Sequence, residues 1–267
     1  MSIVARAKAA LRERFTSLFP ITVDHQGYTS CPQANLLPGI SLADFEKELR
    51  CGDGGELKKK FCAVHSSAAL AVNCFAPFNT RPADIMLCGK RGAESVEFEK
   101  HLPIFRGGTP PNMDVWIDRG SGAVAVESKL LEYLTLKLPA FAKTYERLAR
   151  NAEPCWWAVY EQAKEGAAQH LDRAQLVKHY FGLSAYRKRH PDQQLSLLYL
   201  FWEPLNWDEV AECRRHRGEL EACAGAVSAS CIDFRWTTYS QLWEEWSTVP
   251  ALAHHAQRLK ARYEVRV

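Results

Sequence analysis

The sequence lacks long apolar stretches. None of its hydrophobic runs approaches the roughly 18 residues that a membrane-spanning helix needs. Residues 1–14 alternate charged residues with alanine and leucine, so they lack the uninterrupted apolar stretch of a signal peptide and are typical of a surface helix. We therefore expect a cytoplasmic protein with no membrane partner.

Sequence signatures of several common enzyme classes are also absent. The chain contains no GxSxG, GxxxxGK(S/T) or HExxH motif, which leaves little support for a hydrolase of small substrates. The nine cysteines form no CxxC pair, which argues against a zinc ribbon or a thioredoxin-like site. Cys213, His216 and Cys223 are only weak evidence of a metal site, so we expect free thiols, as in a reducing compartment.

What is present is the composition of a globular protein. Of the 267 residues, 47% are hydrophobic and 24% are charged, which suits one large domain or one domain with appendages. The net charge is only +3, but the segment from Lys137 to His190 contains ten lysines and arginines against five acids. A basic second half suits a polyanionic partner, although a charged run is more often a solvated helix face.

The spacing of apolar residues predicts a helix followed by strands. Lys58 to Phe75 has apolar residues three to four positions apart, which predicts a helix, whereas Ser95 to Phe105 alternates with period two and predicts a strand. Met113 to Asp118 and Ala123 to Lys129 favour β-structure, and the glycine-containing link between them predicts a hairpin. Leu195 to Trp202 is almost wholly apolar, as in a central strand covered on both faces.

The remaining segments are mostly helical by pattern. Helices are expected near 42–50 and at 141–151, 155–165, 171–189, 206–224, 239–247 and 251–263, with a strand at 231–237. This order predicts an α/β fold with a mixed central sheet flanked by helices and with extra N- and C-terminal helices. We divide the chain into a helical and loop arm at 1–57, a main domain at 58–247 and a C-terminal helix at 248–267.

Three residues of the predicted hairpin carry chemistry. Side chains alternate along a strand, so Glu127 and Lys129 share one face, preceded on that face by two small alanines. Asp114 opens the partner strand and can lie opposite Glu127. Two carboxylates suit a hard cation such as Mg²⁺, and a neighbouring ammonium suits the hydrolysis of phosphodiesters.

The bare spacing is not specific, because Asp44 followed by Glu56-Leu57-Lys58 nearly repeats it. That second match has no apolar strand leading into Glu56, so only the hairpin brings the three groups together. The alternative for the hairpin is an exposed ion pair at the end of a strand, with Asp114 capping a loop.

These residues resemble the PD-(D/E)XK nuclease superfamily, which has the restriction-endonuclease-like fold. The resemblance rests on the stretches NMDVWI at 112–117 and AVAVESK at 123–129. The chain also resembles a bacterial family of restriction endonucleases in HSSAALAVN at 65–73, FE at 98–99 and ESKLLEY at 127–133, and the likeness covers roughly residues 60–245. The proline of the superfamily's Pro-Asp pair is replaced by Met113 here, but that proline is not a ligand.

The resemblance implies an αβββαβ core that binds Mg²⁺, for which Mn²⁺ could substitute. It implies that Asp114, Glu127 and the main-chain carbonyl of Ser128 are metal ligands and that Lys129 is the catalytic cation. Superfamily members often add a further acid, for which Glu99 is our first choice. Further expected site residues are Glu97 as the alternative to Glu99, and Gln175, Lys178 and His179 as contacts to the substrate backbone.

Two functions follow. The first is a DNA endonuclease of restriction or defence type that cuts double-stranded DNA, for which a homodimer is plausible because double-strand cutters often need two active sites. The second is a nucleic-acid-binding protein without catalysis, in which residues 171–189 form a helix-turn-helix with its turn near Phe181-Gly182. Cleavage that depends on a divalent metal distinguishes the two.

Overall fold

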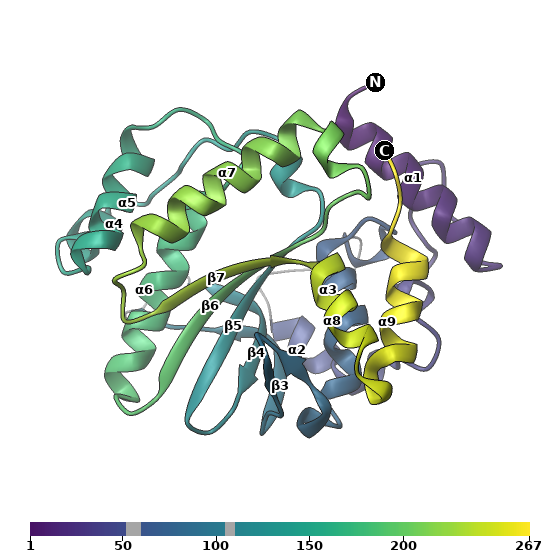
Figure 1. Ribbon diagram of the computed structural model, residues 1–267, viewed down its shortest axis with the longest axis horizontal. Helices are drawn as coiled ribbons and strands as arrows, with labels where there is room; N and C mark the ends of the chain where they lie inside the picture. The colour runs from purple at the N-terminus through teal and green to yellow at the C-terminus, as the bar shows by residue number, and fades with distance from the viewer. Residues whose placement is uncertain (52–59, 105–109) are drawn as a thin grey trace.

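The computed structural model describes residues 1–51, 60–104 and 110–267, and its centre is a five-stranded sheet (Figure 1). The strand order is β3-β4-β5-β6-β7. The strands are β3 (Ser95–His101), β4 (Asn112–Asp118), β5 (Gly122–Lys129), β6 (Gln194–Phe201) and β7 (Asp233–Thr238). β3, β4 and β5 pair antiparallel, whereas β6 pairs parallel with both β5 and β7. The predicted mixed sheet is therefore confirmed.

Helices cover both faces of this sheet (Figure 1). On one face lie α4 (Thr144–Ala149), α5 (Pro154–Glu165), α6 (Arg173–Arg189) and α7 (Ala211–Ala226). On the other lie α2 (Glu46–Cys51), α3 (Ser67–Phe75), α8 (Tyr239–Ser247) and α9 (Pro250–Tyr263), and the N-terminal helix α1 (Ile3–Leu18) packs on α9. The predicted α/β class, with extra helices at both ends, is confirmed. None of the helices among the described residues has the length and apolar character needed to cross a membrane.

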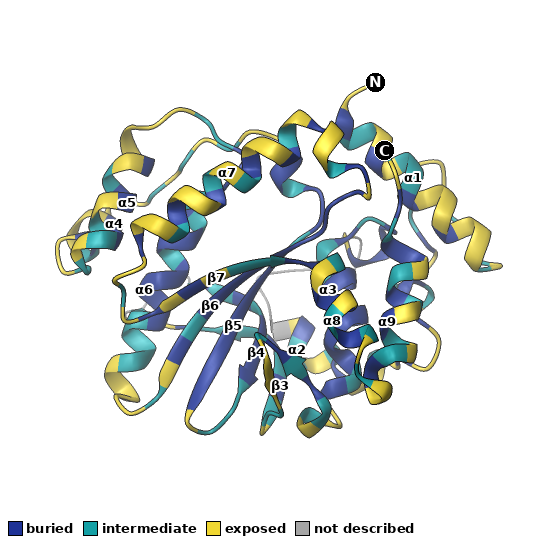
Figure 2. Ribbon diagram, in the orientation of Figure 1, coloured by how far each residue is buried: buried dark blue, intermediate teal, exposed yellow. Residues whose placement is uncertain are grey.

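The two faces of β5 are buried against different helices (Figure 2). Trp116 of β4 lies opposite Ala125, and its ring contacts Tyr186 of α6 at 4.9 Å between centroids. On the reverse face, the Ser128 hydroxyl lies 2.7 Å from that of Tyr239 in α8. Alternation along β5 therefore directs Ala125, Glu127 and Lys129 toward α6.

A buried arginine fixes the terminal helices to each other. Arg262 of α9 is only 2% exposed, and one of its guanidinium nitrogens donates a hydrogen bond of 2.8 Å to the backbone carbonyl of Asn35. Its guanidinium also lies 5.0 Å from the ring centroid of Phe15 in α1. No carboxylate of the described residues pairs with Arg262, so these carbonyl and ring contacts stabilise its charge.

Several helices and strands begin or end at other residues than the sequence predicts. The helix expected at 58–75 begins only at Ser67, because the Ser66 side chain accepts a hydrogen bond from Ala69 N–H and caps the helix there. Residues 58 and 59 lie outside the described residues, as do Phe105, most of the loop that precedes Pro110, and the Glu56-Leu57-Lys58 match. A small hairpin of β1 (Met86–Leu87) and β2 (Lys90–Arg91) was not predicted.

The prediction of a helix-turn-helix at 171–189 is wrong. Residues 173–189 form the single uninterrupted helix α6, and Gly182 lies within it. A β-carbon at Gly182 would lie 2.6 Å from Pro111 and 2.9 Å from Leu102, so close packing of α6 against these residues explains the glycine. The glycine serves helix packing and does not form a turn.

Candidate active site

The predicted hairpin brings Asp114, Glu127 and Lys129 together. The β4–β5 ladder pairs Val115 with Val126, so Asp114 and Glu127 are the next residues along the two strands. The backbone N–H of Ser128 donates a hydrogen bond of 2.7 Å to Oδ2 of Asp114, which holds this carboxylate against β5.

Glu127 is the most enclosed member of the site, with only 2% of its side chain exposed. The ammonium of Lys129 forms an ion pair with Oε1, and Nε2 of His179 in α6 lies 2.8 Å from Oε2. Burial alone would raise the pKa of Glu127, but the charge of Lys129 and the contact with His179 outweigh it and lower the pKa to about 2. Glu127 is therefore a carboxylate at neutral pH.

Asp114 has the opposite electrostatic balance. Its pKa lies well above the usual value, first because protein atoms displace water from its carboxylate and second because of the charge of Glu127. Burial lowers the pKa of Lys129, but the charges of Glu127 and Asp114 outweigh that effect and raise it, so its ammonium is retained. Asp114 as a whole is only partly buried, so solvent still reaches this side of the pair.

A cavity of about 110 Å³ opens beside Lys129. Its walls include Gln175 and Asp172 from the start of α6, Tyr199 from β6, and Glu132 from the segment that follows β5. The Glu132 carboxylate accepts the backbone N–H groups of Leu130 and Leu131, at 2.7 and 3.0 Å, which fixes its position. A substrate group in this cavity would contact Lys129 directly.

The three residues expected to contact substrate have separate positions. Gln175 lines the cavity, as its predicted role requires. His179, one turn further along α6, is only 2% exposed and contacts Glu127, so it lies behind the carboxylate and away from the substrate. Lys178 points to a different face of α6, where its ammonium lies 5.9 Å from the ring centroid of Phe141.

Of the two further acids, Glu99 lies closer to the pair. Its backbone has a φ of +53°, and it interrupts the β3–β4 ladder between the pairs of Phe98 and Lys100. Such strained backbone clusters at functional sites. The charge of Glu99 contributes to the raised pKa of Asp114, and its carboxylate accepts a hydrogen bond from Asn112. Glu97 instead forms an ion pair of 2.7 Å with Lys100.

The donor set suits a magnesium ion. Asp114 and Glu127 supply two carboxylates. The third donor is the Ser128 carbonyl: the N–H and C=O of one strand residue point to the same side, and the Ser128 N–H points to Asp114, so the carbonyl is directed toward β4 as well. Mg²⁺ binds through one or two carboxylates and keeps several waters. In the part of the chain that the structure describes, no three His, Cys, Asp or Glu side chains form an all-protein cage. The fit therefore rests on two carboxylates and a carbonyl.

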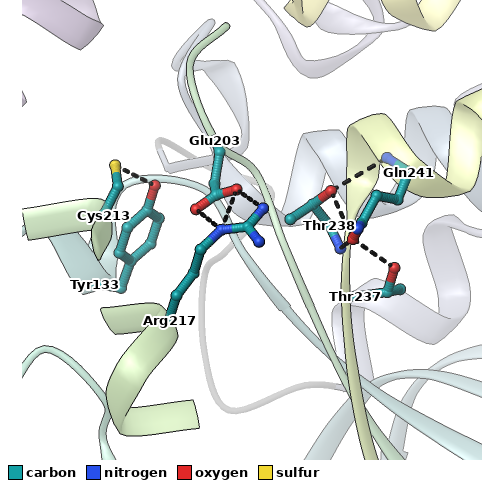
Figure 3. A network of polar contacts seen from close by, with 7 residues as sticks. All are labelled: Tyr133, Glu203, Cys213, Arg217, Thr237, Thr238 and Gln241. Atoms are coloured by element: carbon teal, nitrogen blue, oxygen red, sulfur yellow. Dashed lines mark hydrogen bonds and ion pairs between the residues drawn. The ribbon is translucent and has the colours of Figure 1, made fainter. Parts of the chain in front are cut away.

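Polar contacts fix the same end of the sheet beyond the predicted residues (Figure 3). Glu203, just after β6, is 3% exposed and forms a bidentate ion pair with Arg217 of α7, with a shortest distance of 2.6 Å. Beside it, the hydroxyl of Tyr133 lies 3.4 Å from Sγ of Cys213, and a capping box links Thr238 with Gln241 at the start of α8. Thr238 and Gln241 have the spacing of a capping box, which the sequence could have revealed, whereas the pairs Glu203–Arg217 and Tyr133–Cys213 have no recognisable spacing and only the fold reveals them.

One of the three comparisons with known proteins gives a match. No curated protein and no solved structure is significantly similar to the chain. A family model described as Restriction Endonuclease associating with ARP matches residues 10–264, which include every residue of the candidate site. The predicted resemblance to restriction endonucleases is confirmed: the chain belongs to the family Restriction Endonuclease associating with ARP.

Proposed function

We propose that this chain is a Mg²⁺-dependent phosphodiesterase that cuts within double-stranded DNA, with Mn²⁺ able to replace Mg²⁺. Its family indicates a nuclease of defence type. The observation that carries the finer proposal is the convergence of Asp114 and Glu127, with the Lys129 ammonium on Glu127 and a cavity beside it.

Each side chain has a part in this proposal. Asp114, Glu127 and the Ser128 carbonyl hold the metal ion, with Glu99 as a further acid and Glu97 as its alternative. A bound Mg²⁺ polarises the scissile phosphate and lowers the pKa of a coordinated water. The Lys129 ammonium stabilises the negative charge that develops on the phosphate oxygens or orients the attacking water.

The residues of α6 support that arrangement. His179 holds the second oxygen of Glu127, so its role is to position a metal ligand. Gln175 lines the cavity, where its amide can donate to a phosphate oxygen of the substrate. Lys178 lies outside the cavity walls, which leaves it at most a contact with a more distant phosphate.

The test is cleavage of supercoiled plasmid in Mg²⁺ or Mn²⁺ by wild type and by Asp114→Asn, Glu127→Gln and Lys129→Met. Removing one member of such a centre costs about 10²–10³-fold or more in rate. Asp118→Asn is the matched control, because Asp118 lies at the other end of the same strand, where its carboxylate accepts a hydrogen bond from the Gly120 backbone. Full activity in all three site variants, with the control equally active, rejects the proposal.

The same assay identifies the acid that completes the site, the mode of cleavage and the substrate. Glu99→Gln and Glu97→Gln show which acid completes the site, and we expect the larger loss for Glu99. Relaxed circles followed by linear plasmid indicate endonuclease action on DNA, and a matched RNA duplex tests the choice of substrate. Double-strand cleavage needs two cuts, so light scattering should report whether the active species is a homodimer.

A further inference from the structure

We propose that a second pocket, formed by α1 and the turn at residues 24–28, binds a phosphate group of the nucleic-acid strand that enters the candidate active site. This inference rests on the proposed nuclease function and extends it. The pocket has a volume of about 540 Å³. Its polar walls are Lys8, Arg12, His25, Gln26, Tyr28 and His65.

Helix α1 presents one side to this pocket. Residues 5, 8, 9 and 12 line it, and spacings of three, four and seven place them on a single helical face. A different face of α1, with Ile3, Ala7, Leu11 and Phe15, is buried in the core. The helix is therefore held in place by its apolar residues while Lys8 and Arg12 remain on the wall of the pocket.

The charged side chains that line the pocket are the cations Lys8 and Arg12. Among the described residues, no carboxylate forms an ion pair with Lys8 or Arg12, and no acidic side chain lines the pocket. Two cations that line one pocket and have no carboxylate paired with them form a site for an anion, and phosphate is the anion that a nucleic-acid substrate brings.

The opposite wall is rigid. The carboxylate of Asp24 accepts the backbone N–H groups of Gln26 and Tyr28 at 2.8 and 2.9 Å, and one guanidinium nitrogen of Arg12 donates to the His25 carbonyl at 2.7 Å. Gly27 has a φ of +86°, which other residues adopt only with strain. The wall is therefore preorganised, so binding does not require the turn to become ordered.

His65 supplies a buried ring nitrogen. Its Nδ1 is shielded from solvent and has no hydrogen-bond partner among the described residues. Burial, followed by the charge of Lys8, lowers the pKa of His65 to about 4, so the ring is neutral at pH 7 and one of its nitrogens carries a proton. The Tyr28 ring packs edge-on against it at 6.1 Å, which adds an aromatic surface to the pocket.

Glu132 connects this pocket with the cavity of the candidate active site. It lines that cavity, and its charge raises the pKa of Lys129 together with the larger effects of Glu127 and Asp114. The same charge raises the pKa of His65 against the larger effect of burial. Both residues therefore lie within electrostatic range of one carboxylate. We therefore place the phosphate beside Lys129 and the phosphate in the pocket on the same strand.

The test is binding of a labelled DNA duplex without divalent metal, measured by fluorescence anisotropy at several salt concentrations. The variant is Lys8→Ala/Arg12→Ala. The matched control is Arg6→Ala/Arg14→Ala, which removes the same charge from other faces of α1. We expect about a tenfold or larger loss of affinity for the variant, a salt slope smaller by about one to two, and less than about a threefold loss for the control.

Two probes separate the sources of phosphate. Duplexes with 5′-phosphate and 5′-hydroxyl ends are compared in wild type and variant. A preference for the 5′-phosphate that disappears in the variant identifies a terminal phosphate, whereas equal losses on both duplexes identify a backbone phosphate. Both outcomes support the pocket. Equal affinity and salt slope in wild type and variant, or equal losses in variant and control, overturn it.

Because the binding assay contains no metal, it is independent of cleavage. If binding depends on Lys8 and Arg12 but no metal supports cleavage, the proposed nuclease function fails and the pocket stands. If cleavage requires Lys129 while the Lys8→Ala/Arg12→Ala variant binds and cuts like wild type, the pocket fails and the nuclease stands. His65→Phe, which keeps an aromatic ring and removes the ring nitrogens, should weaken binding by a smaller factor than the double variant.

Discussion

Replacing His179 by phenylalanine should change how the protein responds to metal. The side chains of His179 and Glu127 are 3% and 2% exposed, and their contact of 2.8 Å holds Oε2 while Lys129 holds Oε1. A buried hydrogen bond to a charged group contributes about 1.5–3 kcal/mol, and losing the partner of a metal ligand typically costs about 10–100-fold in metal affinity or activity. We expect His179→Phe to lower the affinity for Mg²⁺ or the cleavage rate by about 10–100-fold.

The assay is the initial rate of plasmid cleavage as a function of Mg²⁺ concentration. A positioning role predicts that the half-saturating Mg²⁺ concentration rises and that His179→Gln, which keeps a polar group, recovers part of the loss. Lys178→Gln is the matched control for the Mg²⁺ dependence, because the Lys178 ammonium lies over the ring of Phe141 on a different face of α6. A His179→Phe protein that folds and keeps the wild-type rate and Mg²⁺ dependence would refute the reasoning.

Three further predictions concern stability, and each is checked by equilibrium denaturation. Arg262→Met removes buried hydrogen bonds from a charged donor and should lower the free energy of unfolding by about 3 kcal/mol, whereas an unchanged midpoint would contradict the role of this residue. Burial first, and the neighbouring His170 and Arg217 second, lower the pKa of His216 to about 3, so the unfolded chain binds this proton more readily than the folded one. His216 should therefore contribute stability that is present above pH 6.5. This stability is lost as the pH falls from 6.5 toward 3, by roughly 4 kcal/mol at most. His216→Phe should flatten this pH dependence of the free energy of unfolding. Gly182→Ala would place a methyl group 2.6 Å from Pro111 and should destabilise by about 1–3 kcal/mol, whereas Gly218→Ala, with open space around it in α7, should stabilise by up to about 1 kcal/mol.

The central strands could be predicted because their signals are local. The β4–β5 hairpin has alternating side chains and a glycine-containing link, and the structure reproduces it with Gly120 at a φ of +72°. β6 was predicted from its apolar run and is buried over nearly its whole length. In both cases a period of two or an unbroken apolar stretch reflects burial by a sheet and its helices.

The helices on the faces were less predictable in detail, because packing decides their limits. Gly182 is a turn signal by sequence, but in the structure it allows close contact between α6 and the segment around Leu102 and Pro111. The helix expected from residue 206 begins only at Ala211, after a short 3₁₀ turn at Trp207–Glu209. Neither the position of Gly182 within α6 nor the start of α7 depends on local helix propensity, so residue spacing could not predict them.

The candidate site was partly predictable for the same reason. Strand alternation places Glu127 and Lys129 on one face, and pairing places Asp114 beside them. The contact between His179 and Glu127 depends on the rotation of α6 over the sheet, which helical spacing alone cannot fix. The pocket at Lys8 and Arg12 joins α1 to a turn and to His65, and no motif of the sequence links these segments.

The most direct measurement of the central claim is the anomalous diffraction of a crystal soaked in Mn²⁺. We predict one manganese ion in contact with the carboxylates of Asp114 and Glu127 and with the Ser128 carbonyl, and no such ion in crystals of Asp114→Asn. Manganese bound elsewhere would contradict the assignment of this site as a nuclease centre. The same conclusion would follow from crystals soaked to saturation in which no ion lies between the two carboxylates and the Lys129 ammonium still pairs with Glu127.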